Sequence, residues 1–313
     1  MRVGNLSDRL TLFTERGAVD VEQASDGLFL PDPQAVYARW DEFRGWGAQH
    51  CDAAGAEFSP ADLGAPSPRP PQIFGIGANY RDHIAEGVHL NMNIKLPEYP
   101  PVFTKFLSSF TGPRGQIPLP SATVDWEAEL VVVVGKEAHN LDSTENGWDY
   151  VAGLTVGQDL SDRVVQLRDQ IPQLSLGKSF PGFSPTGPWL VTPDEFANPD
   201  DLELGCAVNG DTKQKGRTSD LHFSVPALIA ELSTVVVLYP GDVIFTGTPS
   251  GVGFTQRPPV YLAAGDELVT TIEGIGEMRH TFRSAADARQ GSDQLAIQRL
   301  TASFPKTPTT SDA

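Results

Sequence analysis

Two glutamates stand one residue apart at the start of a strongly apolar run. Glu127 and Glu129 lead directly into residues 130–134, which are typical of a buried β-strand. Side chains at positions i and i+2 of a strand share one face, so the two carboxylates should lie together. Such carboxylates repel each other, and a hard divalent cation (Mg²⁺, Mn²⁺ or Ca²⁺) relieves the repulsion. The alternative is a solvated strand edge.

Asp159 is the third acidic residue of interest. It follows the apolar strand expected over 151–157, where the backbone should hold a carboxylate in a fixed place. The alternative is that Asp159 caps a helix beginning near Ser161. Glu127, Glu129 and Asp159 are therefore candidates for one divalent-metal site, with the solvated strand edge and the helix cap as the alternatives.

His83 and Glu86 are a second candidate pair. If the segment 82–86 is helical, the two side chains lie three residues apart on one face and can form a hydrogen bond. A carboxylate-oriented imidazole is a general base that can activate water. The alternative is a surface helix with an ordinary contact between these two side chains.

Lys178, between Gly177 and Ser179, is a candidate to hold a carboxylate or a developing oxyanion. In a chain of net charge −17 the alternative is a plain surface lysine. Arg163 and Gln166 follow Asp159 closely and would lie on one side of a helix. The same two interpretations apply to them.

Two glycine-rich segments give little support to nucleotide binding. Gly75 and Gly77 open like a dinucleotide fingerprint, but Tyr80 stands where the third glycine belongs. The loop 247–253 lacks the Gly-Lys-Ser/Thr ending of a phosphate-binding loop. The Gly-x-Ser-x-Gly motif of α/β-hydrolases is also missing from the sequence.

Many short strands must position these residues. We predict a β-rich main domain over 71–287, with a helix at 225–234 that begins after Ser224 and has Pro226 in its first turn. Short strands between Gly/Pro turns favour a sandwich, barrel or rolled sheet over repeated βαβ units. The expected strands are 73–76, 102–106, 129–134, 151–158, 189–192, 202–208, 242–246, 267–272 and 277–282.

A small α/β unit is expected before the main domain, over residues 1–70. It should contain a hairpin at 10–21, a helix at 33–46 and a linker rich in Pro, Gly and Ala at 61–71. The polar tail 288–313 is expected to be disordered.

Composition excludes several classes of protein. The chain has 313 residues, 40% hydrophobic and 20% charged, which is ordinary for a globular protein. Its excess of acidic residues disfavours nucleic acids and anionic membranes as partners. The 2 cysteines cannot form a disulfide framework, and neither a secretory signal nor a membrane-spanning run is visible. We therefore expect a cytoplasmic protein.

Taken in order, these blocks resemble the fumarylacetoacetate hydrolase family, and in particular its acylpyruvate hydrolases. The resemblance covers about 73–282, and the ordered set is far more specific than any single block. It rests on Gly77–His83 with Glu86, Val124–Leu130, Gln158–Ser161, Gly177–Phe180, Gly187–Trp189, Val208–Gly210, Pro240–Ile244, Thr246–Gly253 and Ile272–Gly276.

The resemblance implies a mixed β-sandwich roll, a Mg²⁺-type site and a homodimer. In the family, the residues that match the three carboxylates bind the metal. Those that match His83 and Glu86 activate water on a lid, and the match to Lys178 supports the bound substrate. The positions that match Tyr80, Arg163, Gln166 and Thr248 line the substrate pocket.

The implied reaction is hydrolysis of a carbon–carbon bond in a small anionic 1,3-diketo acid, as occurs in aromatic catabolism. The metal would chelate two substrate oxygens, and hydroxide formed by His83 would attack the distal carbonyl. The leaving enolate would be held by the metal and Lys178. The alternatives are an oxaloacetate-like decarboxylase, a keto–enol or double-bond isomerase, and a metal-binding module without turnover.

Two features depart from the family pattern or vary within it. Pro181 and Gly182 follow Phe180, where the family usually has Asp and a small residue. This change is expected to reshape the pocket beside Lys178. The segment 88–100 is expected to contact the variable end of the substrate.

Overall fold

The computed structural model describes residues 1–89, 96–144 and 146–285. The helices are α1 (Val21–Ala24), α2 (Trp40–Gln49), α3 (Arg81–His89), α4 (Arg163–Gln166), α5 (Leu174–Gly177) and α6 (Val225–Ser233), with 3₁₀ turns η1 (Ala35–Arg39), η2 (Pro60–Asp62), η3 (Leu107–Ser109), η4 (Gly147–Tyr150), η5 (Pro193–Glu195), η6 (Thr218–Asp220) and η7 (Gly253–Thr255). The strands are β1 (Arg2–Leu6), β2 (Arg9–Thr14), β3 (Gly17–Asp20), β4 (Leu63–Gly64), β5 (Ile73–Ile76), β6 (Val102–Phe103), β7 (Phe110–Thr111), β8 (Arg114–Leu119), β9 (Val124–Asp125), β10 (Ala128–Val134), β11 (Val151–Gln158), β12 (Ser161–Asp162), β13 (Ser184–Val191), β14 (Glu203–Val208), β15 (Asp211–Arg217), β16 (Val243–Phe245), β17 (Glu267–Ile272) and β18 (Gly276–Ser284).

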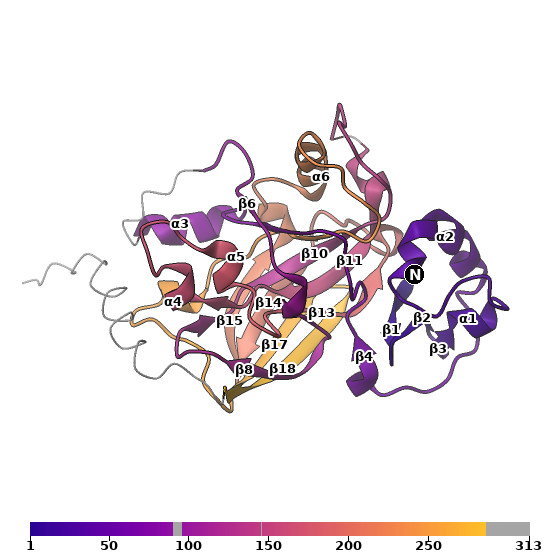
Figure 1. Cartoon of the computed structure of the whole chain (residues 1–313), viewed down its shortest axis with the longest axis horizontal. Helices are drawn as coiled ribbons and strands as arrows, with labels where there is room; N and C mark the ends of the chain where they lie inside the picture. The colour runs from indigo at the N-terminus through magenta and orange to yellow at the C-terminus, as the bar shows by residue number, and fades with distance from the viewer. Residues whose placement is uncertain (90–95, 145, 286–313) are drawn as a thin grey trace, which may run out of the picture.

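Two β-sheets pack against each other at the centre of the molecule (Figure 1). The larger follows the order β3-β2-β1-β13-β11-β10-β16-β5-β6, and the smaller β15-β14-β17-β18-β8. Most neighbours are antiparallel, but three pairs are parallel: β5 with β16, β7 with β13 and β8 with β18. Leu130 and Val132 share one core with Leu204 and Ile272 of the smaller sheet. The predicted class, a β-rich α+β fold with a mixed sandwich, is confirmed.

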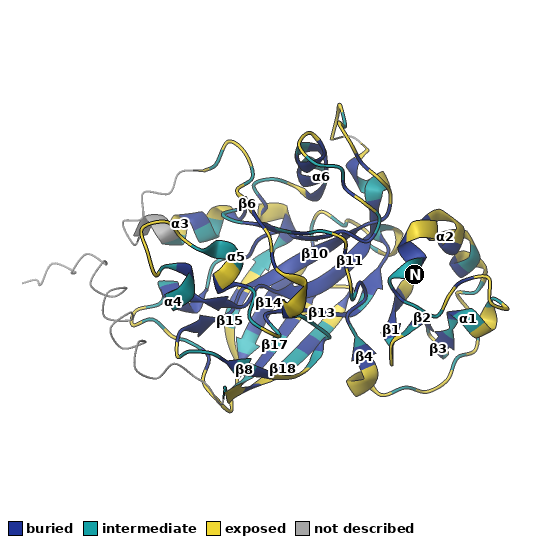
Figure 2. Ribbon diagram, viewed as in Figure 1, coloured by how far each residue is buried: buried dark blue, intermediate teal, exposed yellow. Residues whose placement is uncertain are grey.

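Strand β10 is buried on both faces (Figure 2). Leu130 and Val132 face the core between the sheets, whereas Val131 and Val133 face a second core that includes aromatic residues of η1 and α2. Because strand side chains alternate, Glu129 projects from the face that carries Val131. An apolar strand thus fixes the position of this carboxylate.

The first 64 residues extend the larger sheet. β1 pairs antiparallel with β13, with Arg2 opposite Val191. The predicted hairpin is present as β2 and β3, and the predicted helix over 33–46 is divided into η1 and α2. Phe43 of α2 belongs to the same hydrophobic core as Val131 and Phe245. The leading unit is therefore joined to the main domain by strand pairing and a shared core.

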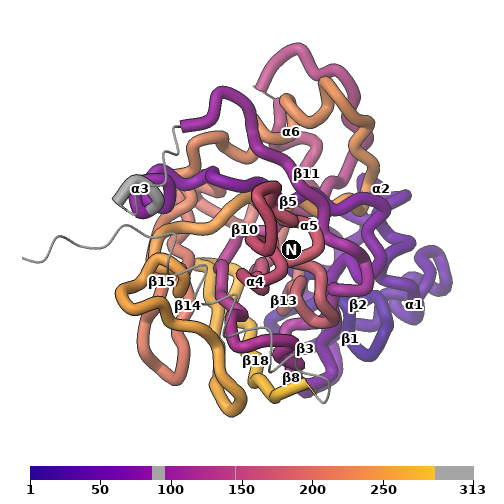
Figure 3. Tube along the Cα trace, turned by 60° about the vertical axis from the view of Figure 1, so that its left-hand side comes forward, coloured from indigo at the N-terminus to yellow at the C-terminus, as the bar shows by residue number. Residues whose placement is uncertain are grey.

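Helices α3, α4 and α5 lie at the end of the molecule away from the leading unit (Figure 1), and the turned view shows α4 beside α5 (Figure 3). Helix α6 begins after Ser224, whose Oγ accepts from the Ala227 N–H at 3.4 Å, as predicted. Seven strands were not expected from the sequence: β1, β4, β7, β8, β9, β12 and β15. The predicted tail 288–313 and part of the segment 88–100 lie outside the described residues. None of the described helices is long and apolar enough to cross a membrane.

Candidate metal and catalytic site

The pairing of β10 with β11 brings the three predicted carboxylates together. The strands are antiparallel, with Glu129 opposite Gly157, and the Asp159 N–H donates to the Glu127 carbonyl at 2.9 Å. One oxygen from each of Glu127, Glu129 and Asp159 lies within 4.8 Å of the others. Their exposed fractions are 7%, 2% and 0%, so Glu127 and Glu129 do not form a solvated strand edge.

The helix-cap alternative for Asp159 does not hold. Helix α4 begins after Asp162, whose carboxylate accepts from the Val165 N–H at 3.1 Å. Asp159 instead directs both carboxylate oxygens to lysine side chains, Oδ1 to Lys105 and Oδ2 to Lys178.

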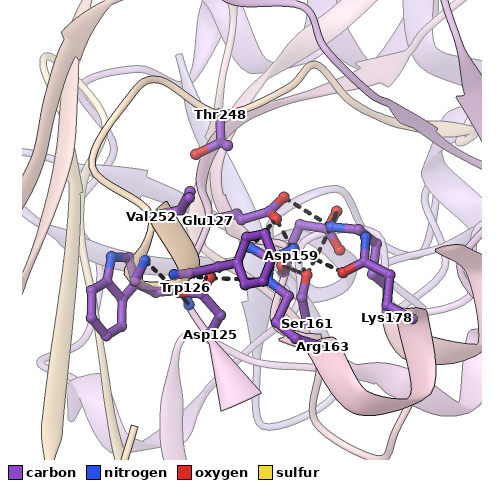
Figure 4. Close-up of polar contacts among 12 residues, drawn as sticks. Asp125, Trp126, Glu127, Asp159, Ser161, Arg163, Lys178, Thr248 and Val252 are labelled. Atoms are coloured by element: carbon purple, nitrogen blue, oxygen red, sulfur yellow. Dashed lines mark hydrogen bonds and ion pairs between the residues drawn. The ribbon is translucent and has the colours of Figure 1, made fainter. Parts of the chain in front are cut away.

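Lys178 is a buried bridge between two of the carboxylates (Figure 4). Its Nζ donates to Glu127 Oε2 at 2.8 Å, to Asp159 Oδ2 at 2.6 Å and to Ser161 Oγ at 2.8 Å. Burial acts to lower the pKa of Lys178, but Asp159 and Glu127 outweigh it and raise the pKa above its ordinary value. The surface-lysine alternative is therefore wrong.

Lys105 is a member of the site that we did not identify from the sequence. Its side chain is 1% exposed, and its Nζ forms an ion pair with Asp159 Oδ1 and donates to the Lys178 carbonyl at 2.5 Å. Burial lowers the pKa of Lys105, and the charge of Asp159 opposes that effect. The sequence offered one sign of this role, because Lys105 interrupts the largely apolar stretch 102–106.

The pKa values of Glu127 and Glu129 are shifted in opposite directions. Burial raises the pKa of Glu129 well above its ordinary value, and the charges of Asp159 and Glu127 raise it further. Burial acts in the same direction on Glu127, but Lys178 and Arg163 overcome it and hold its pKa at about 2.

The donor set fits a hard divalent cation. Glu129 Oε2 accepts from the Gly247 N–H at 2.8 Å, and no described cationic side chain forms an ion pair with Glu129. Gly247 has φ +103°, a conformation that favours glycine. A buried carboxylate without a cation is costly, and a divalent ion held by three clustered carboxylate oxygens removes that cost.

Arg163 lies beside the carboxylates, and Asp125 holds its guanidinium in place. Its guanidinium donates to Asp125 Oδ2 at 2.7 and 3.0 Å and to Gln166 Oε1 at 2.9 Å, and it pairs with Glu127 Oε1 at 2.8 Å (Figure 4). Asp125 also accepts from the N–H groups of Gly253 and Phe254. Arg163 and Gln166 share one side of α4, as predicted, whereas the anchoring role of Asp125 was not predicted.

Helix α3 carries the predicted histidine–glutamate pair. His83 Nδ1 and Glu86 Oε2 are 3.1 Å apart, and Glu86 Oε1 accepts from the Gly251 N–H at 2.8 Å. Asp82 Oδ2 accepts from the N–H and Oγ of Ser250, at 3.2 and 2.7 Å. The segment 82–86 is helical, which is the condition for this contact, and the helix is docked on the loop that follows Thr248.

One cavity of about 290 Å³ collects most of the candidate residues. Its lining includes His83, Glu127, Glu129, Arg163, Gln166, Lys178 and Thr248. Thr248 Oγ1 donates to the Ala128 carbonyl and accepts from the buried Gln214, both within 2.9 Å. Pro181 and Gly182 are not part of this lining, so the structure does not place the family departure in the cavity.

Three candidates, Tyr80, Glu86 and Asp159, are not among the lining residues of the cavity. Glu86 and Asp159 contact residues that are, whereas Tyr80 lies in the core. It belongs to the core between the sheets and is 0% exposed. Burial raises the pKa of Tyr80 well above its ordinary value, and its hydroxyl has no hydrogen-bond partner among the described residues. Its position therefore gives no support to the predicted contact with substrate.

Comparison with known proteins places this site in a family. A family model for the C-terminal domain of fumarylacetoacetate hydrolase matches residues 72–283. The human mitochondrial oxaloacetate tautomerase FAHD2A is 45% identical over 214 residues, which is 68% of this chain and 66% of that protein. The matched region thus spans just under two thirds of that relative.

Two solved structures extend the comparison to most of the chain. A Mycobacterium smegmatis protein provisionally named HpcE superposes with a TM-score of 0.84 at 50% identity, covering 91% of this chain and 100% of the other. Maleylpyruvate hydrolase from Sphingobium sp. SYK-6, solved with manganese(II) and pyruvate, gives a TM-score of 0.72 at 28% identity with the same coverage. The chain belongs to the fumarylacetoacetate hydrolase family.

Proposed function

We propose that this protein is a metal-dependent hydrolase that cleaves the carbon–carbon bond of an acylpyruvate-like 1,3-diketo acid. The observation that carries this proposal is that His83 lines the same cavity as Glu127, Glu129 and Lys178. A water-activating base and a cation site therefore face one small space. The proposed cofactor is Mg²⁺, with Mn²⁺ or Ca²⁺ as alternatives.

Glu127, Glu129 and Asp159 would hold the metal, because their oxygens cluster within 4.8 Å. When bound, a divalent ion supplies Lewis-acid polarisation of the keto-acid oxygens. Arg163 and Gln166 line the same cavity, where they can contact the keto-acid end of the substrate beside the proposed metal ligands.

His83 is oriented to remove a proton from water. Its Nδ1 lies 3.1 Å from the Glu86 carboxylate, which favours the tautomer with the proton on Nδ1. Nε2 is then the atom that accepts the proton of the attacking water. The docking of Glu86 on the Gly251 N–H fixes this arrangement.

The reaction consumes one water. Its oxygen bonds to the carbonyl carbon distal to the carboxylate, and the adjacent carbon–carbon bond breaks with its electron pair on the methylene carbon. Lys178 stabilises the negative charge that develops on the departing enolate. Return of a proton to the methylene carbon yields pyruvate and a carboxylic acid. The pyruvate bound to the related maleylpyruvate hydrolase supports a pyruvate product.

Keto–enol tautomerisation of oxaloacetate is the second candidate. The 45% identity to the human oxaloacetate tautomerase favours it. That reaction also passes through enol chemistry beside a cation, but it needs only proton transfer and no attacking water.

Product analysis separates these reactions. Purified protein is incubated with acetylpyruvate or oxaloacetate, with Mg²⁺, Mn²⁺ or EDTA, and products are identified by NMR and mass. We expect metal-dependent formation of equal amounts of acetate and pyruvate from acetylpyruvate, and none with His83→Ala. Enol–keto interconversion of oxaloacetate without cleavage of acetylpyruvate would establish the tautomerase instead, and release of CO₂ would establish a decarboxylase.

We also propose that the protein is a cytoplasmic homodimer that acts on a small anionic keto acid and binds neither nucleic acid nor membranes. The acidic surface charge supports the exclusion of phosphate-rich partners. The human relative is named as mitochondrial, so its location differs from the one proposed for this protein. Sedimentation equilibrium tests the dimer.

A further inference from the structure

Much of the cavity lining is apolar. Beyond the carboxylates, its lining includes Ile84 of α3, Phe103 of β6, Leu167 after α4, Leu174 of α5 and Phe254 of η7. These residues come from separate elements and line the same cavity as Glu127 and Glu129. A substrate whose keto-acid end lies at the carboxylates must place its other end against these side chains.

The cations that line the cavity already have carboxylate partners. Among the described lining residues they are Arg163, paired with Asp125 and Glu127, and Lys178, paired with Glu127 and Asp159. Phe254 and Phe103 cover these two cations, with 5.7 Å from Arg163 Cζ and 5.3 Å from Lys178 Nζ to the respective ring centroids. A second substrate carboxylate would therefore be buried against aliphatic and aromatic groups without a free counter-ion.

We infer that the enzyme selects 1,3-diketo acids whose distal acyl group is uncharged and apolar, and that it rejects acyl groups ending in a carboxylate. This inference rests on the proposed hydrolase function and names its substrate class. The cavity volume of about 290 Å³ sets an upper limit on the size of the acyl group. Leu167, Leu174 and Phe254 are the specificity-determining residues.

A substrate series measures this preference. Acetyl-, propanoyl- and butanoylpyruvate should show kcat/KM rising about fourfold for each added methylene, equivalent to about 0.8 kcal/mol per CH₂. The most informative pair is 4-methylpentanoylpyruvate and succinylpyruvate. The two differ only in the end of the acyl chain, where an isopropyl group takes the place of a carboxylate of similar shape. We expect a preference of about a hundredfold or more for the apolar member, because an unpaired charge is costly to bury.

A cation introduced into the apolar wall should reverse the selectivity. Leu174→Arg places a guanidinium at the lining and should raise kcat/KM for succinylpyruvate at least about tenfold while lowering that for the apolar partner. Leu176→Arg is the matched control, because Leu176 is on the same helix, is 45% exposed and is not a lining residue. Leu167→Arg is a second test should Leu174→Arg fold poorly, and thermal melting verifies each variant.

The outcomes separate the inference from the proposed function. Cleavage of acetylpyruvate with a preference for the diacid would overturn the inference and leave the hydrolase intact. Failure of every acylpyruvate to react would overturn the hydrolase and the inference with it. A preference for apolar acyl groups that is reversed by Leu174→Arg and retained by Leu176→Arg supports both.

Discussion

Five charged side chains lie buried together where β10 begins and β11 ends: Lys105, Glu127, Glu129, Asp159 and Lys178. Lys178 bridges Glu127 and Asp159, and Lys105 holds the second oxygen of Asp159. Glu129 has a backbone N–H as its partner, so the cost of burying negative charge falls mainly on Glu129. Replacing this residue should therefore separate metal binding from folding.

Glu129→Gln tests the assignment of the metal ligands. Glutamine keeps a carbonyl oxygen for the Gly247 N–H but removes the charge. We expect the Mn²⁺ affinity, measured by calorimetry, to fall at least about tenfold, while the metal-free protein becomes no less stable. Glu137→Gln, at an exposed position, is the control. Unchanged Mn²⁺ affinity in Glu129→Gln would refute the assignment.

Lys105→Met tests whether the buried lysine holds the site together. Its removal leaves Asp159 Oδ1 and the Lys178 carbonyl without this donor. Breaking a buried ion pair from one side costs about 3–5 kcal/mol. We expect a loss of about that size in the free energy of unfolding, measured with urea. Lys136→Met, at an exposed lysine, should cost far less. Equal stability of the two variants would contradict this role.

At the scale of elements, α3 and the loop after Thr248 are joined into one structural unit by hydrogen bonds. Asp82 accepts a hydrogen bond from the Ser250 N–H, and Glu86 accepts one from the Gly251 N–H. The loop backbone therefore holds the helix that carries His83. The position of His83, the proposed base, therefore depends on the hydrogen bonds of Asp82 and Glu86 to this loop.

Weakening this docking should impair catalysis in graded steps. Ser250→Ala removes the hydroxyl contact, whereas Asp82→Ala removes both contacts and the cap on the His83 N–H. We expect kcat/KM to fall about tenfold or more in Asp82→Ala and less in Ser250→Ala, because the base is misplaced. Hydrogen exchange of α3 should accelerate in the same order. Unchanged exchange in Asp82→Ala would show that the docking contacts do not hold the helix.

Strand β18 carries a pH-sensitive element. His280 is 1% exposed, and its Nε2 donates to the Gly112 carbonyl at 3.0 Å. Burial lowers the pKa of His280 from 6.5 to about 4. Between these pH values the unfolded chain binds a proton that the folded protein does not, so acid favours unfolding. The contribution of His280 to stability is present above pH 6.5 and is lost as pH falls toward 4.

His280→Gln should remove this part of the acid sensitivity. Glutamine still offers an N–H to Gly112 but does not titrate. Between pH 7 and pH 4 the wild-type protein should lose about 3 kcal/mol more of unfolding free energy than the variant. Urea denaturation at several pH values measures the difference, with His139→Gln, at an exposed position, as the control. Parallel pH profiles for wild type and His280→Gln would contradict the assignment.

At the scale of the whole molecule, metal binding should stabilise the fold. A ligand that binds only the folded state at about 100 times its Kd adds about 2.7 kcal/mol. For a chain of this size that corresponds to a rise in Tm of roughly 4 °C. Calorimetry with Mn²⁺ or EDTA should show this rise for the wild type and not for Glu129→Gln. A Tm that does not respond to Mn²⁺ would favour a protein without a metal site.

The sequence predicted local features well and long-range pairings poorly. The i, i+2 spacing placed Glu127 and Glu129 on one face, and the i, i+3 spacing placed His83 beside Glu86. Such patterns report on one element at a time. Lys105 contacts Asp159 across 54 residues of sequence, and that pairing depends on the order of strands in the sheet. The assignment of three carboxylates to a metal site drew on the family resemblance more than on spacing.

The leading residues also protect the sheet. β1 occupies one side of β13, and β11 occupies the other. In a chain that began at residue 71, the N–H and C=O groups of β13 near Leu190 would lose their partners. An open apolar edge of this kind recruits strands from other chains, and the usual result is aggregation. The segment before the main domain therefore covers a sheet edge that would otherwise favour aggregation, in addition to extending the core.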